Sequence, residues 1–221
     1  MPRPRVHDPD QLLDAAERLV VDGGPEQLTL RRLGTAAGVS NGAIYHAFGS
    51  LAALQGRMWL RAATDFLALQ TELIDRASAG TGPDAAVDAV VAAADAPARF
   101  ADQRPAAAKM LMTVRREQLL GPELPTEVAD ALLDLDRQLV SSVLCRLATS
   151  LWGRRDGPSV EVVTTCVVDL PTALLRRALA ELDPDGAGRI SSDARQRLET
   201  AVRAVLAHPP PRKAGTRRRS R

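Results

Sequence analysis

The feature that most constrains the fold of this chain is residues 29–48, which read TLRRLGTAAGVSNGAIYHAF. The first half of this segment has its apolar residues at the spacing of one helix face, namely Leu30, Leu33 and Ala37. Thr29 is placed to cap that helix at its start. Gly38 can end it, because glycine adopts the left-handed backbone conformation without a steric penalty. The segment therefore begins with a short predicted helix.

The second half of the segment predicts another short helix directly after the first. Ser40 is placed to cap this helix and Gly49 to end it. The residues that return to its buried side are Ile44, Tyr45 and Phe48. Because residues 38–40 are too few to separate two independent helices, the helices must cross closely at a steep angle. This is the helix-turn-helix arrangement, in which the second helix enters the major groove of DNA.

Two further observations favour this interpretation over an ordinary helix pair with exposed arginines, which stays open as the alternative. Gly34 has no side chain where the second helix would cross the first, and a glycine inside a helix costs about 1 kcal/mol relative to alanine unless packing requires it. In addition, residues 27–64 contain no Asp or Glu. The cations in this run are Arg31, Arg32, Arg57 and Arg61. An acid-free run of this length suits a surface that faces phosphates.

The same segment resembles the DNA-binding domain of TetR-family transcriptional regulators. The matching positions are Ala37-Gly38-Val39-Ser40, Gly42, Ile44-Tyr45-His46 and Phe48, about ten positions at fixed spacing when the apolar residues of the first helix are included. Two positions depart from the family pattern. Gly34 replaces the usual alanine, and Leu51 stands where the family usually has a lysine that opens the fourth helix. The second change removes a phosphate contact that the resemblance would otherwise imply.

The candidate DNA-binding residues are Thr29, Arg31, Ser40, Asn41, Gly42, Ala43, Tyr45 and His46. Asn41 can pair with adenine in bidentate fashion or reach a phosphate, and the small residues after it permit close approach to the base edges. The resemblance implies phosphate contacts for Tyr45, His46, Thr29 and Arg31. Two alternatives stay open: the Tyr45 ring could pack against the first helix, and His46 could be an ordinary surface histidine.

The rest of the chain predicts an all-α fold, with an N-terminal three-helix helix-turn-helix domain followed by a larger helical ligand-binding and dimerisation domain. A content of 45% hydrophobic residues is enough for such a core. The expected domains are residues 1–50 for DNA binding, 51–208 for effector binding and dimerisation, and 209–221 as a basic disordered tail. Further helices are expected at 8–23, 50–77, 84–100 (interrupted or ended near Pro97), 105–120, 126–152, 159–182 (kinked at Pro171) and 192–206.

Charge is distributed unevenly along the chain. Residues 209–221 contain six cations and no acid, and because the whole chain carries +2, residues 1–208 carry a net charge of −4. The tail is therefore expected to raise affinity for DNA without regard to sequence. This leaves a non-regulatory, architectural DNA-binding protein as the alternative function.

The partners expected are double-stranded DNA with a palindromic operator, a second copy of the chain, and a small, mostly apolar effector. The last two long helices have the broad apolar faces of a four-helix dimer interface, although burial within one copy would explain them too. If the resemblance holds, the middle helices enclose a ligand cavity. The candidate lining residues are Phe66, Phe100, Met110, Met112, Trp152 and Cys166, each of which could instead be plain core.

Other classes of protein fit the sequence less well. None of the three histidines has a glutamate three residues before it, so helical di-metal chemistry has no ligand set, and we expect no enzyme activity, metal or cofactor. Cys145 and Cys166 fall in apolar helical runs, which makes oxidant sensing a weaker alternative. No apolar run approaches the ~20 residues of a membrane span and no signal peptide is evident, so a cytoplasmic location is expected.

Overall fold

The computed structural model describes residues 8–183 and 188–211, and within them every regular element is helical. The protein therefore has the all-α fold that the sequence predicts. The basic residues of the tail at 212–221 lie outside the described residues, so their expected role is not addressed by the fold. The four N-terminal helices are α1 (Pro9–Gly23), α2 (Leu30–Ala37), α3 (Asn41–Phe48) and α4 (Leu51–Ser78), with the 3₁₀ turn η1 (Pro25–Gln27) between the first two.

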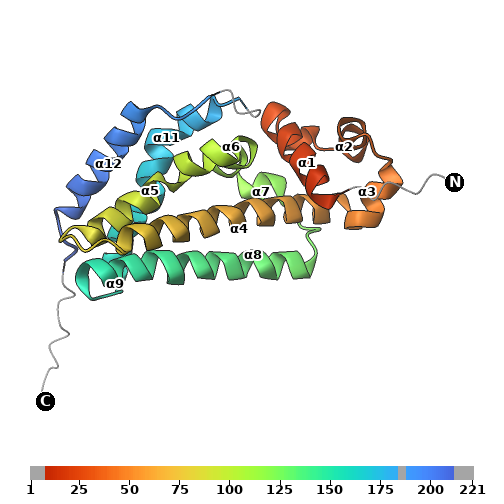
Figure 1. Cartoon of the computed structure of the whole chain (residues 1–221). Helices are drawn as coiled ribbons and strands as arrows, with labels where there is room; N and C mark the ends of the chain where they lie inside the picture. Colours follow the sequence, from red (N-terminus) through yellow and green to blue (C-terminus); the bar gives the residue numbers. More distant parts are fainter. Residues whose placement is uncertain (1–7, 184–187, 212–221) are drawn as a thin grey trace, which may run out of the picture.

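Helices α1, α2 and α3 form a small unit at one end of the molecule, which we call the head (Figure 1). Each begins at the predicted cap. Asp8 accepts the N–H of Asp10 at 3.0 Å, Thr29 that of Arg32 at 3.2 Å, and Ser40 that of Ala43 at 3.2 Å. Gly38 follows α2 with φ +68°, in the left-handed region that glycine adopts without strain. Local capping chemistry thus sets these helix boundaries.

Gly34 explains how α2 and α3 come so close together. A Cβ atom at this position would lie 2.8 Å from the backbone oxygen of Val39 and 3.1 Å from Oδ1 of Asn41. The backbone oxygen cannot move without opening the turn between the helices. The prediction that Gly34 serves close helix crossing is therefore confirmed.

The remaining helices form what we call the body, through which α4 runs as the central long helix (Figure 1). After α4 the chain continues through α5 (Ala85–Gln103), α6 (Pro105–Thr113) and the short α7 (Arg116–Leu119). The expectation that a helix is interrupted or ended near Pro97 was wrong, because α5 runs through this proline. Pro97 is buried where α5 packs between α4 and α12, so tertiary packing outweighs the lost backbone hydrogen bond. The predicted helix 105–120 was also too long, since it breaks after Thr113.

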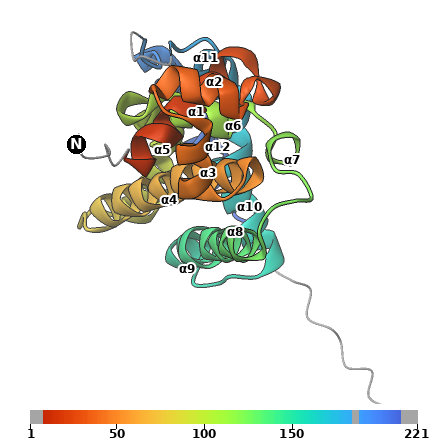
Figure 2. The same cartoon turned by 90° about the vertical axis from the view of Figure 1, so that its right-hand side faces the viewer.

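Two long continuous helices follow, each with a π-helical turn in its middle. The first consists of α8 (Thr126–Gln138), η2 (Leu139–Cys145) and α9 (Arg146–Trp152). The second consists of α10 (Gly157–Thr164), η3 (Thr165–Asp169) and α11 (Leu170–Ala180), and the last helix is α12 (Ser192–Leu206). Seen from the head end, α8 lies beneath α4 and α10 rises beside it (Figure 2). The predicted spans 126–152 and 192–206 are confirmed.

The π-helical turn η3 changes which side of the second long helix is buried. The sequence predicts one apolar face that continues from Val167 to Leu174, but Leu174 is 40% exposed and Leu175 is buried instead. A π-helical turn contains about one residue more than an α-helical turn, so the buried positions move by one residue beyond it. The turn directly precedes Pro171, where the missing N–H removes the regular hydrogen bond.

The same long helix bears on the expected location of the protein. Among the described residues, the helix at 157–180 is the one that is long and apolar enough to cross a bilayer, which corrects the expectation that no run approaches this length. Length and composition are weak evidence, because a core helix of a globular protein passes the same test. Here the helix packs against α5, α6 and α12 as part of the body.

Candidate DNA-binding surface

The structure brings the predicted DNA-binding residues together on the outer side of α2 and α3. Seven of the eight are exposed, and Ala43 is half-buried: the exposed residues are Thr29, Arg31, Ser40, Asn41, Gly42, Tyr45 and His46. The opposite side of the two helices is buried through Leu33, Ile44 and Phe48. The apolar residues thus fix the helices to the head and turn the polar ones toward solvent.

The two capping hydroxyls can serve a second partner. Thr29 and Ser40 each accept a backbone N–H with the side-chain oxygen, which leaves the O–H hydrogen of each free to be donated. Both residues stand at the start of a helix, where the helix dipole and the free N–H groups favour an anion. Ser40 and Thr29 are therefore well placed to hold phosphates of the DNA backbone.

Tyr45 and His46 lie on the exposed side of α3. Tyr45 is 64% exposed, so the prediction that it returns to the buried side of this helix with Ile44 and Phe48 was wrong, and the alternative in which its ring packs against α1 receives no support. A tyrosine ring in water costs solvation energy unless it has a partner, and its hydroxyl can donate to a phosphate. Gly42 is equally open, since a Cβ atom there would meet only the Ser40 hydroxyl at 3.9 Å. Packing within the protein therefore does not explain why position 42 lacks a side chain.

The arginines of the acid-free run divide into two groups. Arg31, Arg32 and Arg57 are exposed, and none of them forms an ion pair within residues 8–183 and 188–211. Arg61, by contrast, is turned inward and binds carboxylates of α1. The expectation that Arg61 contributes to a phosphate-facing surface was wrong. Residues 27–64 contain no acid, but the acids of α1 bind Arg61 from a different part of the sequence.

Three further residues belong to this surface and were not among the eight candidates. Arg32 and Thr35 share a shallow cleft with Thr29 and Arg31 on α2. The Arg57 guanidinium lies 6.0 Å from the centroid of the Phe48 ring, which holds it beside the end of α3. The acid-free run pointed to Arg32 and Arg57, whereas nothing in the sequence distinguished Thr35. Leu51 is half-buried and packs against the core, so no cation stands at this position.

Comparison with known proteins agrees with this geometry. Residues 12–57 match the family model described as bacterial regulatory proteins, tetR family. Residues 12–57 therefore match the N-terminal domain of tetR-family regulators. The matched residues span α1, α2, α3 and the start of α4, so they include the whole outer surface described above.

Solved structures extend the likeness to the body. The fatty acid degradation regulator FadR from Bacillus halodurans superposes with a TM-score of 0.63 at 14% identity, over 90% of this chain and 98% of that one. FadR from Bacillus subtilis, solved in complex with stearoyl-CoA, gives 0.61 at 13% identity over 90% and 96%. PfmR, a TetR-family regulator from Thermus thermophilus, gives 0.51 at 16% identity over 89% and 97%. At identities this low, the superpositions show a shared fold and nothing more.

A comparison with curated protein sequences gave no match. The family model describes residues 12–57 as a domain of bacterial regulatory proteins, and the solved structures show the fold of about 90% of the chain.

The predicted effector-binding residues lie in the body and differ in exposure. Phe100, Met110 and Cys166 are at most 1% exposed, while Phe66, Met112 and Trp152 are half-buried. The Phe66 and Phe100 rings meet edge to face with centroids 5.6 Å apart. Burial raises the pKa of the Cys166 thiol to about 11, which keeps it protonated and unreactive at neutral pH. Oxidant sensing at Cys166 is therefore disfavoured.

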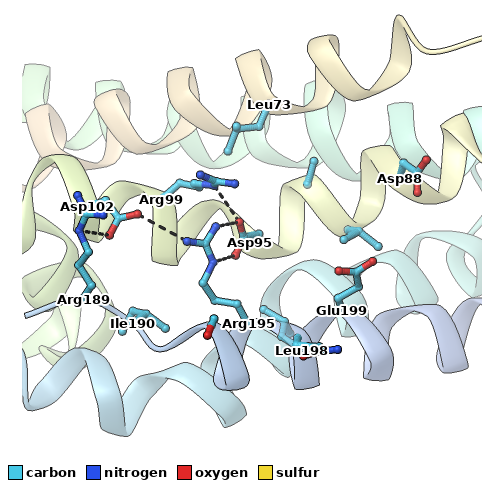
Figure 3. A pocket seen from close by; sticks show the side chains of 14 residues that line it. Leu73, Asp88, Asp95, Arg99, Asp102, Arg189, Ile190, Arg195, Leu198 and Glu199 are labelled. Carbon is cyan, nitrogen blue, oxygen red and sulfur yellow. Dashed lines mark hydrogen bonds and ion pairs between the residues drawn. The ribbon is translucent and has the colours of Figure 1, made fainter.

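A cleft of the body lies elsewhere, between α5 and α12, with a volume of about 700 Å³ (Figure 3). None of the six predicted effector-binding residues lines it. Its charged side chains are already paired. Asp95 binds Arg99 of its own helix α5, and it binds Arg195 of α12 with 2.8 Å from Arg195 Nε to Asp95 Oδ1. Asp102 lies 3.6 Å from Arg195. The ion pairs hold α12 to α5, and within the described residues no group of acids, histidines and cysteines is arranged to bind a metal ion.

Proposed function

We propose that this protein is a TetR-family repressor that binds a palindromic operator as a homodimer in the bacterial cytoplasm and is released by a mostly apolar effector. One observation carries the DNA-binding part: the outer side of α3 presents Asn41, Tyr45 and His46 to solvent beside arginines without carboxylate partners among the described residues. One recognition helix reads few base pairs, so a single copy would bind weakly. Two copies related by a two-fold axis read two half-sites about 34–36 Å apart or a multiple of that.

In this proposal Asn41 contacts a base edge, while Thr29, Arg31, Ser40, Tyr45 and His46 hold phosphates. Gly42 and Ala43 allow α3 to approach the bases closely, because nothing larger than a methyl group stands between the helix and the groove. Phosphate contacts set the position of the head, and the few base contacts select the sequence. Residues 1–50 would act as the DNA-binding domain, 51–208 as the effector and dimer domain, and 209–221 as a basic tail.

The test is selection of bound sequences from random DNA with the full chain. The proposal expects an inverted repeat whose half-site centres are about one helical turn, or a multiple of it, apart. Uniform coating of all DNA would instead support the architectural alternative. If the selected repeat also lies near the gene of this protein, a reporter fused to that promoter should be silent with the protein and active without it.

For the dimer, we propose that α11 and α12 form the interface. Val168 and Leu174 support this, since they are 38% and 40% exposed on the second long helix. A competing surface exists on the first long helix, where Leu133 and Val140 are about as exposed. The double change Val168→Asp with Leu174→Asp should give monomers by light scattering, whereas Leu133→Asp with Val140→Asp should leave dimers. The reverse result would move the interface to the first long helix.

For the effector, we propose a molecule with a long apolar part that enters the body among Phe66, Phe100, Met110, Met112, Trp152 and Cys166. The solved complex of Bacillus subtilis FadR with stearoyl-CoA supports this chemistry, as that protein has the same fold. The three half-buried members offer the entry, since the other three are covered in the absence of ligand. Titration with long-chain acyl-CoA thioesters should release the operator, and Met110→Glu should abolish release because a charge would stand in an apolar site. Unchanged operator binding at saturating thioester would reject this effector class.

A further inference from the structure

A buried carboxylate lies where the head meets the body. Glu17 belongs to α1, and its side chain is only 3% exposed. The residues around it come from two other elements: Arg61 from α4 and Arg104 from the junction of α5 and α6. Because α1 also packs directly on α4 and α6, this carboxylate stands at the centre of the contact between head and body.

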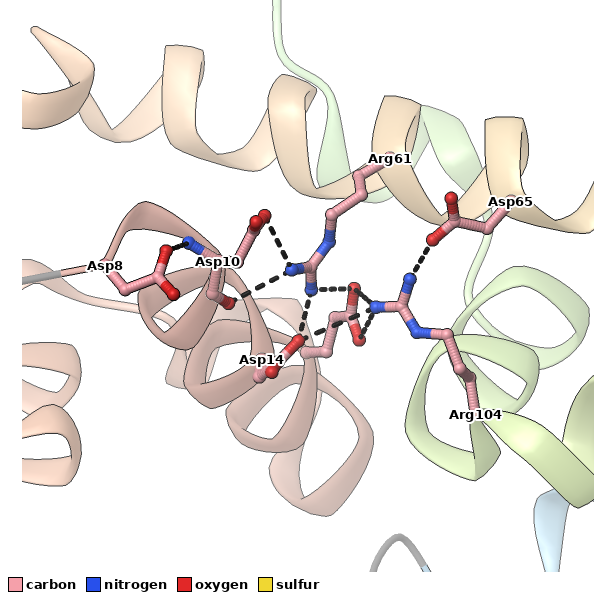
Figure 4. A network of polar contacts seen from close by, with 7 residues as sticks. Asp8, Asp10, Asp14, Arg61, Asp65 and Arg104 are labelled. Atoms are coloured by element: carbon pink, nitrogen blue, oxygen red, sulfur yellow. Dashed lines mark hydrogen bonds and ion pairs between the residues drawn. The ribbon is translucent and has the colours of Figure 1, made fainter.

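The geometry of the pairing is specific (Figure 4). Glu17 Oε1 accepts a hydrogen bond from Nη2 of Arg61 at 2.7 Å. Nη2 of Arg104 lies 3.1 Å from each of the two carboxylate oxygens of Glu17. The two guanidinium groups therefore approach one carboxylate from two elements of the body, which fixes α1 in direction as well as in distance.

A rim of more exposed acids completes this cluster, which we call the head–body latch. Arg61 also binds Asp14 at 2.6 Å and Asp10 at 3.2 Å, both on α1. Arg104 also pairs with Asp65 of α4. Asp10 and Asp14 bind Arg61 and so connect α1 to α4, as Glu17 does. Asp65 of α4 binds Arg104 and so connects α4 to the junction of α5 and α6.

Stability alone does not account for this arrangement. Burying charges costs solvation energy, and a buried ion pair can often be replaced by apolar residues with no loss of stability. The Nε atom of Arg61 is buried without a hydrogen-bond partner within the described residues, which adds to that cost. What a buried pair provides better than an apolar contact is a single orientation, because guanidinium and carboxylate bind in few geometries.

A second close contact lies on the side of α4 that faces away from Arg61, about one helical turn from that residue. Gly56 lies about one turn before Arg61, and a Cβ atom there would lie 2.4 Å from Cδ1 of Leu124 and 2.6 Å from Cγ1 of Val128. The segment before α8 thus touches the backbone of α4 closely. With the latch on one side and this apolar contact on the other, the part of α4 nearest the head is fixed to the body.

We propose that Glu17 is a positioning residue for DNA binding, which through Arg61 and Arg104 sets the orientation of the head on the body and hence the spacing of the two recognition helices in the dimer. This inference rests on the proposed palindromic, dimeric binding. One base pair added between half-sites moves them by about 3.4 Å and about a tenth of a turn. A rigid latch therefore makes the dimer intolerant of altered spacing.

The experiment measures affinity of the full chain for the selected palindrome and for versions with one base pair added or removed between the half-sites. The preference of the unaltered protein for the native spacing, expressed as an affinity ratio, should fall at least about fivefold in Glu17→Gln. Glutamine keeps the size of the side chain and removes the charge. The matched control is Glu72→Gln, which makes the same chemical change at an exposed glutamate of α4 that pairs with Arg76 outside the latch and should leave the ratio unchanged.

A second variant guards against a folding defect in the first. Arg104→Lys keeps the positive charge, but its single nitrogen cannot bind Glu17 and Asp65 together as Nη2 and Nη1 of Arg104 do, so the ratio should fall in it as well. Equal loss of affinity at every spacing in both variants would mean that the latch only stabilises the fold, and the inference would be overturned. If the unaltered protein itself shows no spacing preference, the proposed palindromic binding fails and takes this inference with it.

Discussion

The outward and inward sides of the head use the same residue type in opposite ways. On the outward side, Arg31, Arg32 and Arg57 are exposed and form no ion pair within the described residues. On the inward side, Arg61 and Arg104 are bound by carboxylates of α1 and α4. Uncompensated arginines attract a polyanion, whereas compensated ones orient one protein element on another. Whether an arginine can attract DNA or orients a helix depends on the carboxylates near it in the folded protein. The number of arginines in a stretch of sequence does not decide this.

The cleft between α5 and α12 resembles the inward side. Its arginines, Arg99 and Arg195, are bound to Asp95, and Arg195 also approaches Asp102. By the same reasoning this cleft fastens α12 to the body and has no free cation for an anionic partner among the residues named. The outward side of the head is thus the surface where the charges are left for DNA.

The largest difference between the outward and inward sides of the head is expected in the free energy of unfolding of Arg61→Ala compared with Arg57→Ala. The two arginines lie about one turn apart on α4. Arg61→Ala leaves a buried carboxylate with fewer partners and should lower the free energy of unfolding by about 3–5 kcal/mol. Arg57→Ala removes an exposed side chain and should change it by at most about 0.5 kcal/mol. Chemical denaturation measures both. Similar losses in the two variants would mean that the distinction between the sides is wrong.

The pH dependence of Arg61→Ala sharpens the same comparison. Burial raises the pKa of Glu17. The hydrogen bond from Arg61 and the charge of Arg104 lower it by less, so the pKa of Glu17 lies above its usual value. A carboxyl with a raised folded-state pKa binds more protons folded than unfolded, so its stability contribution falls as pH rises from the unfolded value through the folded one. Removing Arg61 raises this pKa further. The loss in Arg61→Ala should therefore be smaller at acidic than at neutral pH, and a loss that does not change with pH would exclude Glu17 as its cause.

A smaller effect is expected from the paired changes Gly34→Ala and Gly42→Ala. The first places a methyl group 2.8 Å from a backbone oxygen and should destabilise the protein by about 1–3 kcal/mol through overpacking. The second meets open space and should stabilise α3 by up to about 1 kcal/mol, because alanine has the higher helix propensity. Thermal unfolding reports the first difference. Operator binding should be weakened by Gly42→Ala although the fold is intact.

A tenfold effect on DNA binding is expected from Tyr45→Ala, about 1.4 kcal/mol, with the dimer still folded. Tyr45→Phe is the matched control: it keeps the ring and removes the hydroxyl that would donate to a phosphate. If the hydroxyl carries the contact, both variants should weaken binding in a fluorescence anisotropy titration. Retained affinity of Tyr45→Ala at physiological salt would contradict the role proposed for Tyr45.

The smallest effects concern salt dependence. Arg57→Ala should reduce the slope of the logarithm of affinity against the logarithm of salt concentration by about 1, as expected for one lost phosphate contact. Deleting residues 209–221 should flatten the slope further without changing the preferred sequence. A changed sequence preference after the deletion would mean that the tail takes part in base recognition.

The head could be predicted nearly to the residue because its helices are set by local chemistry. Thr29 and Ser40 cap, Gly38 adopts the left-handed conformation, and Gly34 permits the crossing. All four signals depend on near neighbours in the sequence. The inward turn of Arg61 could not be predicted in this way, because its partner acids belong to α1, more than forty residues earlier.

The body was predicted less well for reasons of packing. Pro97 stays within a helix because α5 is buried between two others, which no local rule anticipates. The π-helical turn η3 adds one residue to a turn, so a regular apolar repeat assigned Leu174 instead of Leu175 to the interior. Which of the core residues an effector would contact depends on how the body opens. The residue types alone do not contain that information.

Leu51 has a consequence for how this protein binds DNA of random sequence. An apolar side chain occupies the edge of the head where a lysine would otherwise release counterions from any duplex. In the proposed function, this position would therefore add nothing to the affinity for DNA of random sequence. Leu51→Lys would then be expected to tighten binding to any duplex and to steepen its salt dependence by about one phosphate contact.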